Sequence, residues 1–124
     1  MVADTMGRYP VKVIDQSNEA QWYTVRCVLQ STSVDGFVYE ERLTLWQAES
    51  IDQAIAVAEA EAAEHAGKSG SELLGLAQAC WLAGQPISGA EIYSLMRESE
   101  LGPDDYLDSF FDTGRERQSD SDEQ

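Results

Sequence analysis

The chain has 124 residues, and its 8 lysines and arginines against 23 aspartates and glutamates give a formal net charge of −15. This length allows one small domain, and 43% hydrophobic residues is typical of a globular protein rather than of a disordered acidic tract. Nucleic-acid binding depends on cations that neutralise phosphates, so the charge argues against direct binding to nucleic acid. It permits attraction to a basic protein, although negative charge also simply favours solubility.

The sequence predicts a cytoplasmic protein that does not interact with a membrane. Its apolar runs are shorter than the roughly 20 residues that a membrane helix needs, and its first residues do not follow the order of a signal peptide. Cys27 and Cys80 are too few for a disulfide framework. Each lies in an apolar run, where a free cysteine behaves as a small buried side chain.

Residues 1–20 are turn-rich with one short apolar stretch at 11–14, which predicts a partly ordered N-terminal arm. From residue 21 the pattern alternates with a period of two, which indicates a strand. Residues 31–36 are typical of a turn, and a second alternating run follows up to residue 48. Residues 21–48 are therefore predicted to form an antiparallel hairpin.

Alternation along this hairpin assigns its side chains to two faces. We expect an inner face, packed under helices, made of Tyr23, Val25, Cys27, Leu29, Phe37, Tyr39, Glu41, Leu43 and Leu45. We expect the outer face to be made of Trp22, Thr24, Arg26, Glu40, Arg42, Thr44 and Trp46.

A helix is predicted to begin after Ser50, which offers an N-cap, with Gln53 completing a capping-box pattern. The apolar residues of this helix fall on one stripe, and they are Ile51, Ala54, Ile55, Ala58 and Ala62. Gly67 is the expected end of the helix.

Residues 71–83 fit both a helix and a strand by periodicity. Gly75 inside the run and the turn-rich residues 84–89 after it favour a strand that enters a second hairpin, with residues 90–96 as the return strand. Pro103, followed by Asp104 and Asp105, predicts a short final helix. Its expected buried stripe is Leu107, Phe110 and Phe111.

These elements predict an α+β fold, with an antiparallel four-stranded sheet in ββαββα order and helices on one face. Residues 21–113 form its single domain. The final helix is expected to end near Gly114, and residues 114–124 are expected to be a disordered acidic tail because they contain no aliphatic or aromatic side chain.

Several short stretches occur in an order that resembles a known family. They are WYTVR at 22–26, YEERLTL at 39–45, the helix start at 48–54, GAEIYS at 89–94 and YLDSFF at 106–111. Together they resemble the bacterial domain of unknown function 4288 family over roughly residues 21–113. The resemblance implies a small intracellular bacterial α+β protein without an established activity, and it carries over no catalytic residue.

The sequence offers little for catalysis or metal binding. His65 is the only histidine and lies beside Glu61 and Glu64 near a helix end, where a capping or solvated role is expected. One histidine and two distant cysteines give no zinc set, and the acidic pairs do not match a calcium loop. Motifs for a serine nucleophile, a phosphate loop or a dinucleotide are absent from the sequence. We expect no metal, cofactor or catalytic residue, and enzymatic activity is left open.

The outer face of the hairpin is the more informative surface, because tryptophan and arginine are the residue types that anchor protein interfaces. Its candidate interaction residues are Trp22, Arg26, Glu40, Arg42 and Trp46. The alternative is an ordinary solvated sheet with cross-strand pairs of arginine and glutamate.

The sequence thus favours a non-enzymatic, acidic protein-interaction module, either an immunity-type inhibitor or an adaptor, with a basic protein partner. The alternative is a small-molecule-binding protein or cryptic enzyme, with a pocket between sheet and helices lined by Tyr39, Glu41, Tyr93 and Tyr106. Self-association into a homodimer is a third hypothesis, because edge strands can pair between copies.

Overall fold

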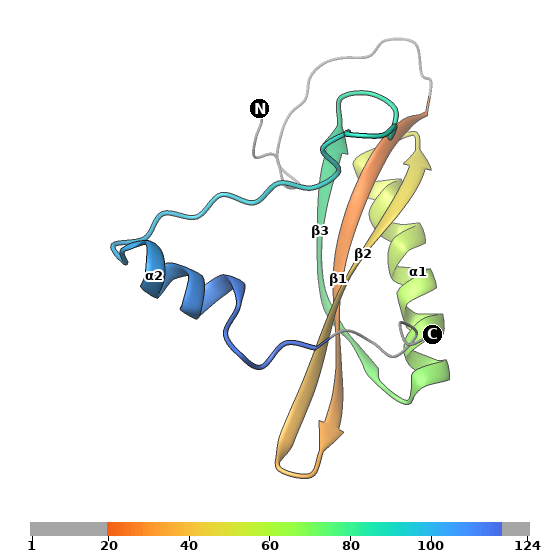
Figure 1. Cartoon of the computed structure of the whole chain (residues 1–124). Helices are drawn as coiled ribbons and strands as arrows, with labels where there is room; N and C mark the ends of the chain where they lie inside the picture. The colour runs from red at the N-terminus through yellow and green to blue at the C-terminus, as the bar shows by residue number, and fades with distance from the viewer. Residues whose placement is uncertain (1–19, 118–124) are drawn as a thin grey trace.

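The computed structural model describes residues 20–117 and contains a three-stranded antiparallel sheet. Strand β1 (Gln21–Ser33) lies in the centre, between β2 (Gly36–Ala48) and β3 (Glu72–Leu82). Helix α1 (Ile51–Ser69) runs along one face of this sheet (Figure 1). The predictions for the N-terminal arm at 1–19 and for the end of the tail at 118–124 lie outside the described residues.

The β1–β2 hairpin is confirmed, and its loop has two residues. Ser33 pairs with Gly36, so only Val34 and Asp35 lie between the paired residues. With this register, every even-numbered residue of β1 pairs with an odd-numbered residue of β2 and the reverse, as in the pair of Tyr23 with Trp46. Paired residues share a face, so the loop length decides which β2 side chains lie beneath the helix.

Helix α1 begins where the sequence predicts and ends later. The Ser50 hydroxyl accepts a hydrogen bond from the backbone N–H of Gln53 at 3.0 Å, which satisfies one of the free donors of the first turn. The helix continues through Gly67, so the predicted end there is wrong. It stops at Gly70, which adopts a left-handed backbone (φ 76°) and donates its N–H to the carbonyl of Ala66.

The core lies between α1 and the face of the sheet formed by the odd-numbered residues of β1. Ala54, Ala58 and Ala62 recur at helical spacing and are buried against this face. Their small side chains let the helix backbone approach the strands closely. The buried strand residues of this cluster are Tyr23, Val25, Cys27, Ala48 and Ala79.

The face prediction is correct for β1 and wrong for β2. Trp46 packs against the core, on the same face as its partner Tyr23. Leu43 and Leu45 pair with Arg26 and Thr24 and therefore lie on the opposite face. The exposed fractions of Phe37, Tyr39, Leu43 and Leu45 range from 40% to 58%. The physical reason is the two-residue loop, which shifts the pairing by one residue relative to the expected arrangement.

The strand favoured for residues 71–83 is confirmed as β3, which pairs with β1 through a register shift between Cys27 and Leu29. The predicted return strand at 90–96 is wrong, because residues 90–99 have no regular secondary structure. Their large apolar residues occur as adjacent pairs at 92–93 and 95–96, so the period of two needed for a half-buried strand is lost. Within residues 20–117, the sheet therefore has three strands instead of four.

The final helix begins at Pro103 as predicted and forms α2 (Pro103–Tyr106), which continues into a π-helical turn, η1 (Leu107–Phe111). Among the elements of residues 20–117, these two contact only each other, and Figure 1 shows them set apart from the sheet. The predicted burial of Leu107, Phe110 and Phe111 is wrong, because all three are exposed. Of the helices in the described part of the chain, only α1 covers the sheet, so the prediction of helices packed on one face holds for one helix.

The register predicts a difference between two apolar positions on β2. Trp46→Ala should lower the free energy of unfolding by about 2 kcal/mol, because it removes a partly buried indole from the core. Leu43→Ala, on the exposed face, should change it by less than about 0.5 kcal/mol. Urea denaturation in dilute solution would measure both values. A larger loss for Leu43→Ala than for Trp46→Ala would contradict the register.

Candidate functional site

The side of the sheet opposite α1, here called the open face, carries most of the side chains that no helix covers. By the strand register this face includes Trp22, Thr24, Arg26, Val28, Phe37, Tyr39, Glu41, Leu43, Leu45, Gln78 and Cys80, and alternation next to the inward-facing Ala77 adds Leu76. This face therefore combines aromatic and aliphatic groups with one arginine and one glutamate.

Residues 90–93 cross part of the open face without joining the sheet. The Thr24 hydroxyl donates a hydrogen bond to the carbonyl of Ile92, and Arg26 donates one to the Tyr93 hydroxyl at 2.9 Å. Thr24 is only 1% exposed as a result. The chain after β3 is thus attached to the centre of the open face, while Leu43 and Leu45 beside it stay exposed.

Arg26 is the polar centre of this face. Its guanidinium donates to Glu41 at 2.8 Å, to the Tyr93 hydroxyl at 2.9 Å and to Gln78 at 3.2 Å. Partial burial acts to lower the pKa of Arg26, but hydrogen bonds to Tyr93 and Glu41 outweigh it and raise the pKa. The charge is therefore neutralised and hydrogen-bonded within the protein, which gives Arg26 a role in joining β1, β2 and β3 to residues 90–93.

The residues of the alternative pocket are brought together only in part. Tyr39, Glu41 and Tyr93 belong to the open face, where Tyr39 accepts a hydrogen bond from Gln30 at 2.9 Å. Tyr106 instead accepts one from Arg97 at 2.9 Å, within the segment that extends from the sheet. An open hollow of about 670 Å³ lies along residues 95–107 and includes Tyr106 but none of the other three residues.

The residues of the predicted interaction face are divided between the two sides of the sheet. Trp22 and Arg26 lie on the open face, whereas Glu40, Arg42 and Trp46 pair with inward-facing residues of β1 and lie on the side of α1. The single aromatic and cationic surface expected from alternation is therefore wrong. The one-residue shift in pairing separates its members.

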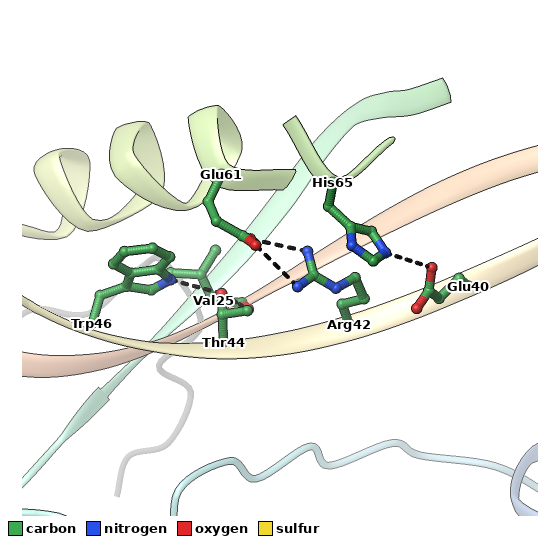
Figure 2. A network of polar contacts seen from close by, with 7 residues as sticks. All are labelled: Val25, Glu40, Arg42, Thr44, Trp46, Glu61 and His65. Atoms are coloured by element: carbon green, nitrogen blue, oxygen red, sulfur yellow. Dashed lines mark hydrogen bonds and ion pairs between the residues drawn. The ribbon is translucent and has the colours of Figure 1, made fainter. Parts of the chain in front are cut away.

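On the side of α1, these β2 residues form a polar network with the helix (Figure 2). Arg42 donates two hydrogen bonds to the Glu61 carboxylate, at 2.9 and 3.2 Å. His65 Nε2 lies 3.3 Å from a carboxylate oxygen of Glu40. The Trp46 indole donates to the Thr44 hydroxyl at 2.6 Å. The network connects the edge strand β2 to α1 beyond the reach of the alanine core. Sequence reasoning missed the contacts of Arg42 and Glu40 with the helix because the expected register placed both residues on the opposite face.

Residues 94–112 contain a second surface that the sequence revealed only in part. This segment is called the arm from here on and is distinct from the N-terminal arm predicted for residues 1–20. Asp104, Asp105 and Asp108 lie on the acidic side of its helical region, because residues three and four apart share a side. Asp112 follows the π-helical turn directly and has a non-helical backbone (φ −131°, ψ 88°). The apolar side consists of Tyr106, Leu107, Phe110 and Phe111. All four carboxylates are exposed and none forms an ion pair with another residue of 20–117.

Contacts within the arm hold its shape. The Arg97 guanidinium lies 4.3 Å from the ring centre of Phe110 and 5.9 Å from that of Tyr106. The two rings are 5.0 Å apart, a distance typical of favourable aromatic pairs. Arg97 therefore connects the extended residues to the helical turn by cation–π contacts as well as by its hydrogen bond to Tyr106.

Other groups in the described residues show no arrangement of a reactive site. Burial raises the pKa of the Cys27 thiol, which disfavours the thiolate needed for nucleophilic chemistry. Within residues 20–117, no three potential metal ligands among His, Cys, Asp and Glu lie together. The same part of the chain has no helix with the length and apolar character required to cross a membrane.

The chain matches no family model, no curated protein and no solved structure. The resemblance to the bacterial domain of unknown function 4288 family therefore stays a prediction.

The contact between Arg42 and Glu61 predicts a pH-dependent contribution to stability. Hydrogen bonds from Arg42 lower the pKa of Glu61 below its ordinary value of 4.5, so the ionised carboxylate favours the folded state. The contribution is fully present above about pH 4.5 and is lost as the pH falls through the lowered pKa of the folded state. Because Glu61 is partly exposed, we expect a coupling of about 0.5 kcal/mol.

A double-mutant cycle with Arg42→Gln and Glu61→Gln, followed by urea denaturation, would measure this coupling at neutral and at acid pH. The coupling energy should be near zero once Glu61 is protonated. A coupling that is equally large in acid would contradict the assigned ion pair.

Proposed function

We propose that this protein is a non-enzymatic, acidic protein-interaction module that binds a basic protein partner, as an immunity-type inhibitor or an adaptor. The acidic side of the arm is the contact surface for that partner. The observation that carries this proposal is the group of four exposed carboxylates, three on a short helical segment set apart from the sheet and one directly after it, without ion pairs among the described residues.

The distribution of charge supports the same surface. Residues 83–117 contain eight acidic residues against three arginines, a net charge of −5, whereas the hairpin at 21–48 has three acidic residues against two arginines, a net charge of −1. Residues 49–82, which contain α1, also carry a net charge of −5, so the negative charge lies on the arm and around the helix and is low on the hairpin. Such a field increases the rate of encounter with a positively charged surface and disfavours acidic partners.

The position of the carboxylates also supports the binding of a protein. An unpaired exposed carboxylate can accept the fork of an arginine without first losing an internal partner. Arg26, Arg42 and their glutamate partners are already paired within the fold. They are therefore poorer contacts for a ligand than the aspartates of the arm.

Capture of partners from the native host by the full chain tests the proposal, with identification by mass spectrometry at low and high salt. The test variant replaces Asp104, Asp105, Asp108 and Asp112 by asparagine. A matched control neutralises four exposed acidic residues elsewhere, with Asp35→Asn, Glu49→Gln, Glu64→Gln and Glu72→Gln. Both variants lose the same net charge, so the comparison isolates position from total charge.

We expect a basic protein that is captured by the original chain and by the control, is released at high salt and is lost from the arm variant. With the purified partner, the arm variant should raise the dissociation constant by about tenfold or more, because charge pairs at an interface are worth more than 1 kcal/mol together. Equal binding by both variants, or binding that resists high salt, would contradict the assignment of the acidic side of the arm.

A further inference from the structure

We propose that two copies of this chain form a symmetric dimer, in which the apolar side of each arm packs on the open face of the other copy. This inference does not depend on the basic partner, because it uses the opposite side of the arm. It places Leu107, Phe110 and Phe111 of one copy on the exposed apolar residues of the partner copy's sheet.

Both surfaces are apolar and both are exposed in the single chain. On the open face, Phe37, Tyr39, Leu43, Leu45 and Leu76 are 40% to 66% exposed. Leu43 and Leu45 pair with Arg26 and Thr24, the residues that hold the segment at 90–93, whereas Phe37 and Tyr39 lie nearer the hairpin loop. On the arm, Leu107 and Phe110 are about half exposed and Phe111 is 74% exposed. Contiguous exposed apolar side chains of this extent on a small protein mark an interaction surface.

The structure of the arm favours a second copy as the occupant. Tyr93 is fixed to Arg26, and residues 94–102 then lead the chain away from the sheet (Figure 1). Nine residues can span up to about 30 Å, enough to reach a neighbouring molecule. Arg97, Tyr106 and Phe110 hold the end of the arm together by contacts among themselves, so the arm keeps its shape without support from its own sheet.

Each copy has one open face and one arm, and a two-fold exchange covers all four surfaces at once. An exchange in one direction only would leave one face and one arm exposed, and would continue into a chain of copies. Strand residues are about 3.3 Å apart, so one helical turn of the arm covers only the part of the open face near Leu43 and Leu45. These two residues and the three of the arm each expose on the order of 100 Å², which gives about 500 Å² per copy and about 1,000 Å² in total, the lower limit of a specific interface. The acidic side of the arm remains outside this contact, so the exchange buries no unpaired carboxylate.

The charge of the chain gives the dimer a salt dependence opposite to that of the basic partner. Two chains with a net charge of −15 repel each other, and added salt screens that repulsion. Salt should therefore strengthen dimerisation while it weakens binding of a basic protein. Absence of the dimer would leave the proposed binding of a basic protein untouched, and absence of a basic partner would leave the proposed dimer untouched.

Two variants of the full chain and their mixture test the exchange by sedimentation velocity, from low micromolar to several hundred micromolar. Leu43→Asp changes the open face, and Phe111→Asp changes the arm. Val34→Asp is the control, because Val34 is 97% exposed at the tip of the hairpin and the added charge is the same. Leu43→Ser is a second face variant in case the aspartate disturbs Arg26, and circular dichroism checks that each variant is folded.

We expect the original chain and Val34→Asp to dimerise, and each face or arm variant to raise the dimer dissociation constant by about tenfold or more. A mixture of the face variant and the arm variant tests whether the arm of one copy packs on the open face of the other. An arm from the face variant can pack on the unchanged face of the arm variant, so an equimolar mixture should regain dimers that neither variant forms alone.

Three results would overturn the proposal. They are a monomeric original chain at every concentration, a dimer that resists both substitutions, and a mixture that stays as monomeric as its components. Pairing of the sheets by their edges would give the second result, and face-to-face packing of the sheets would give a dimer that is weakened by Leu43→Asp but not by Phe111→Asp.

Discussion

The pairing of Ser33 with Gly36 determines the character of both faces of this protein. The side chains of a strand alternate between two faces, so a shift of one residue moves every side chain to the other face. The two-residue loop between the paired positions therefore assigns each β2 residue to one face. Trp46 and Arg42 then lie beneath α1, and Leu43 and Leu45 lie on the open face. A loop longer by one residue would exchange the two sets. The apolar surface available for binding is thus a consequence of the turn rather than of the overall hydrophobicity of the strand.

The alanine stripe of α1 allows polar and aromatic residues of β2 to lie beneath the helix while its leucines lie on the open face. Ala54, Ala58 and Ala62 fill little space, so the helix packs closely on Val25 and Cys27 in the central strand. At the edge strand, the longer side chains of Arg42 and Trp46 fill the remaining space, and Arg42 reaches the Glu61 carboxylate on the helix. A polar residue can lie on the inner side of β2 because the core is narrow and lies on β1. The large apolar residues of β2 are then left for the other face.

Local sequence signals predicted most of the elements. The Ser50 cap, the alternation along β1 and the start at Pro103 each depend on neighbouring residues, and the structure confirms them. The register of β2 could not be chosen by hydrophobicity, because the set with more large apolar residues is the exposed one. The loop length would have corrected this, but residues 30–33 are all polar, so no alternation of apolar side chains marks where β1 ends. The separation of Trp22 and Arg26 from Glu40, Arg42 and Trp46 follows from that one choice.

The missing fourth strand has a different cause, and it explains why the open face stays available. Residues 90–93 are attached by side-chain hydrogen bonds from Thr24 and Arg26, which lie on the face of the sheet rather than at its edge. A segment held in this way crosses the strands, so it covers only the centre of the face and leads the following residues outward. Because the arm starts from this point, its acidic and apolar sides both remain accessible. A basic partner and a second copy would therefore use opposite sides of the same short helical segment, and ionic strength would shift the balance between them in opposite directions.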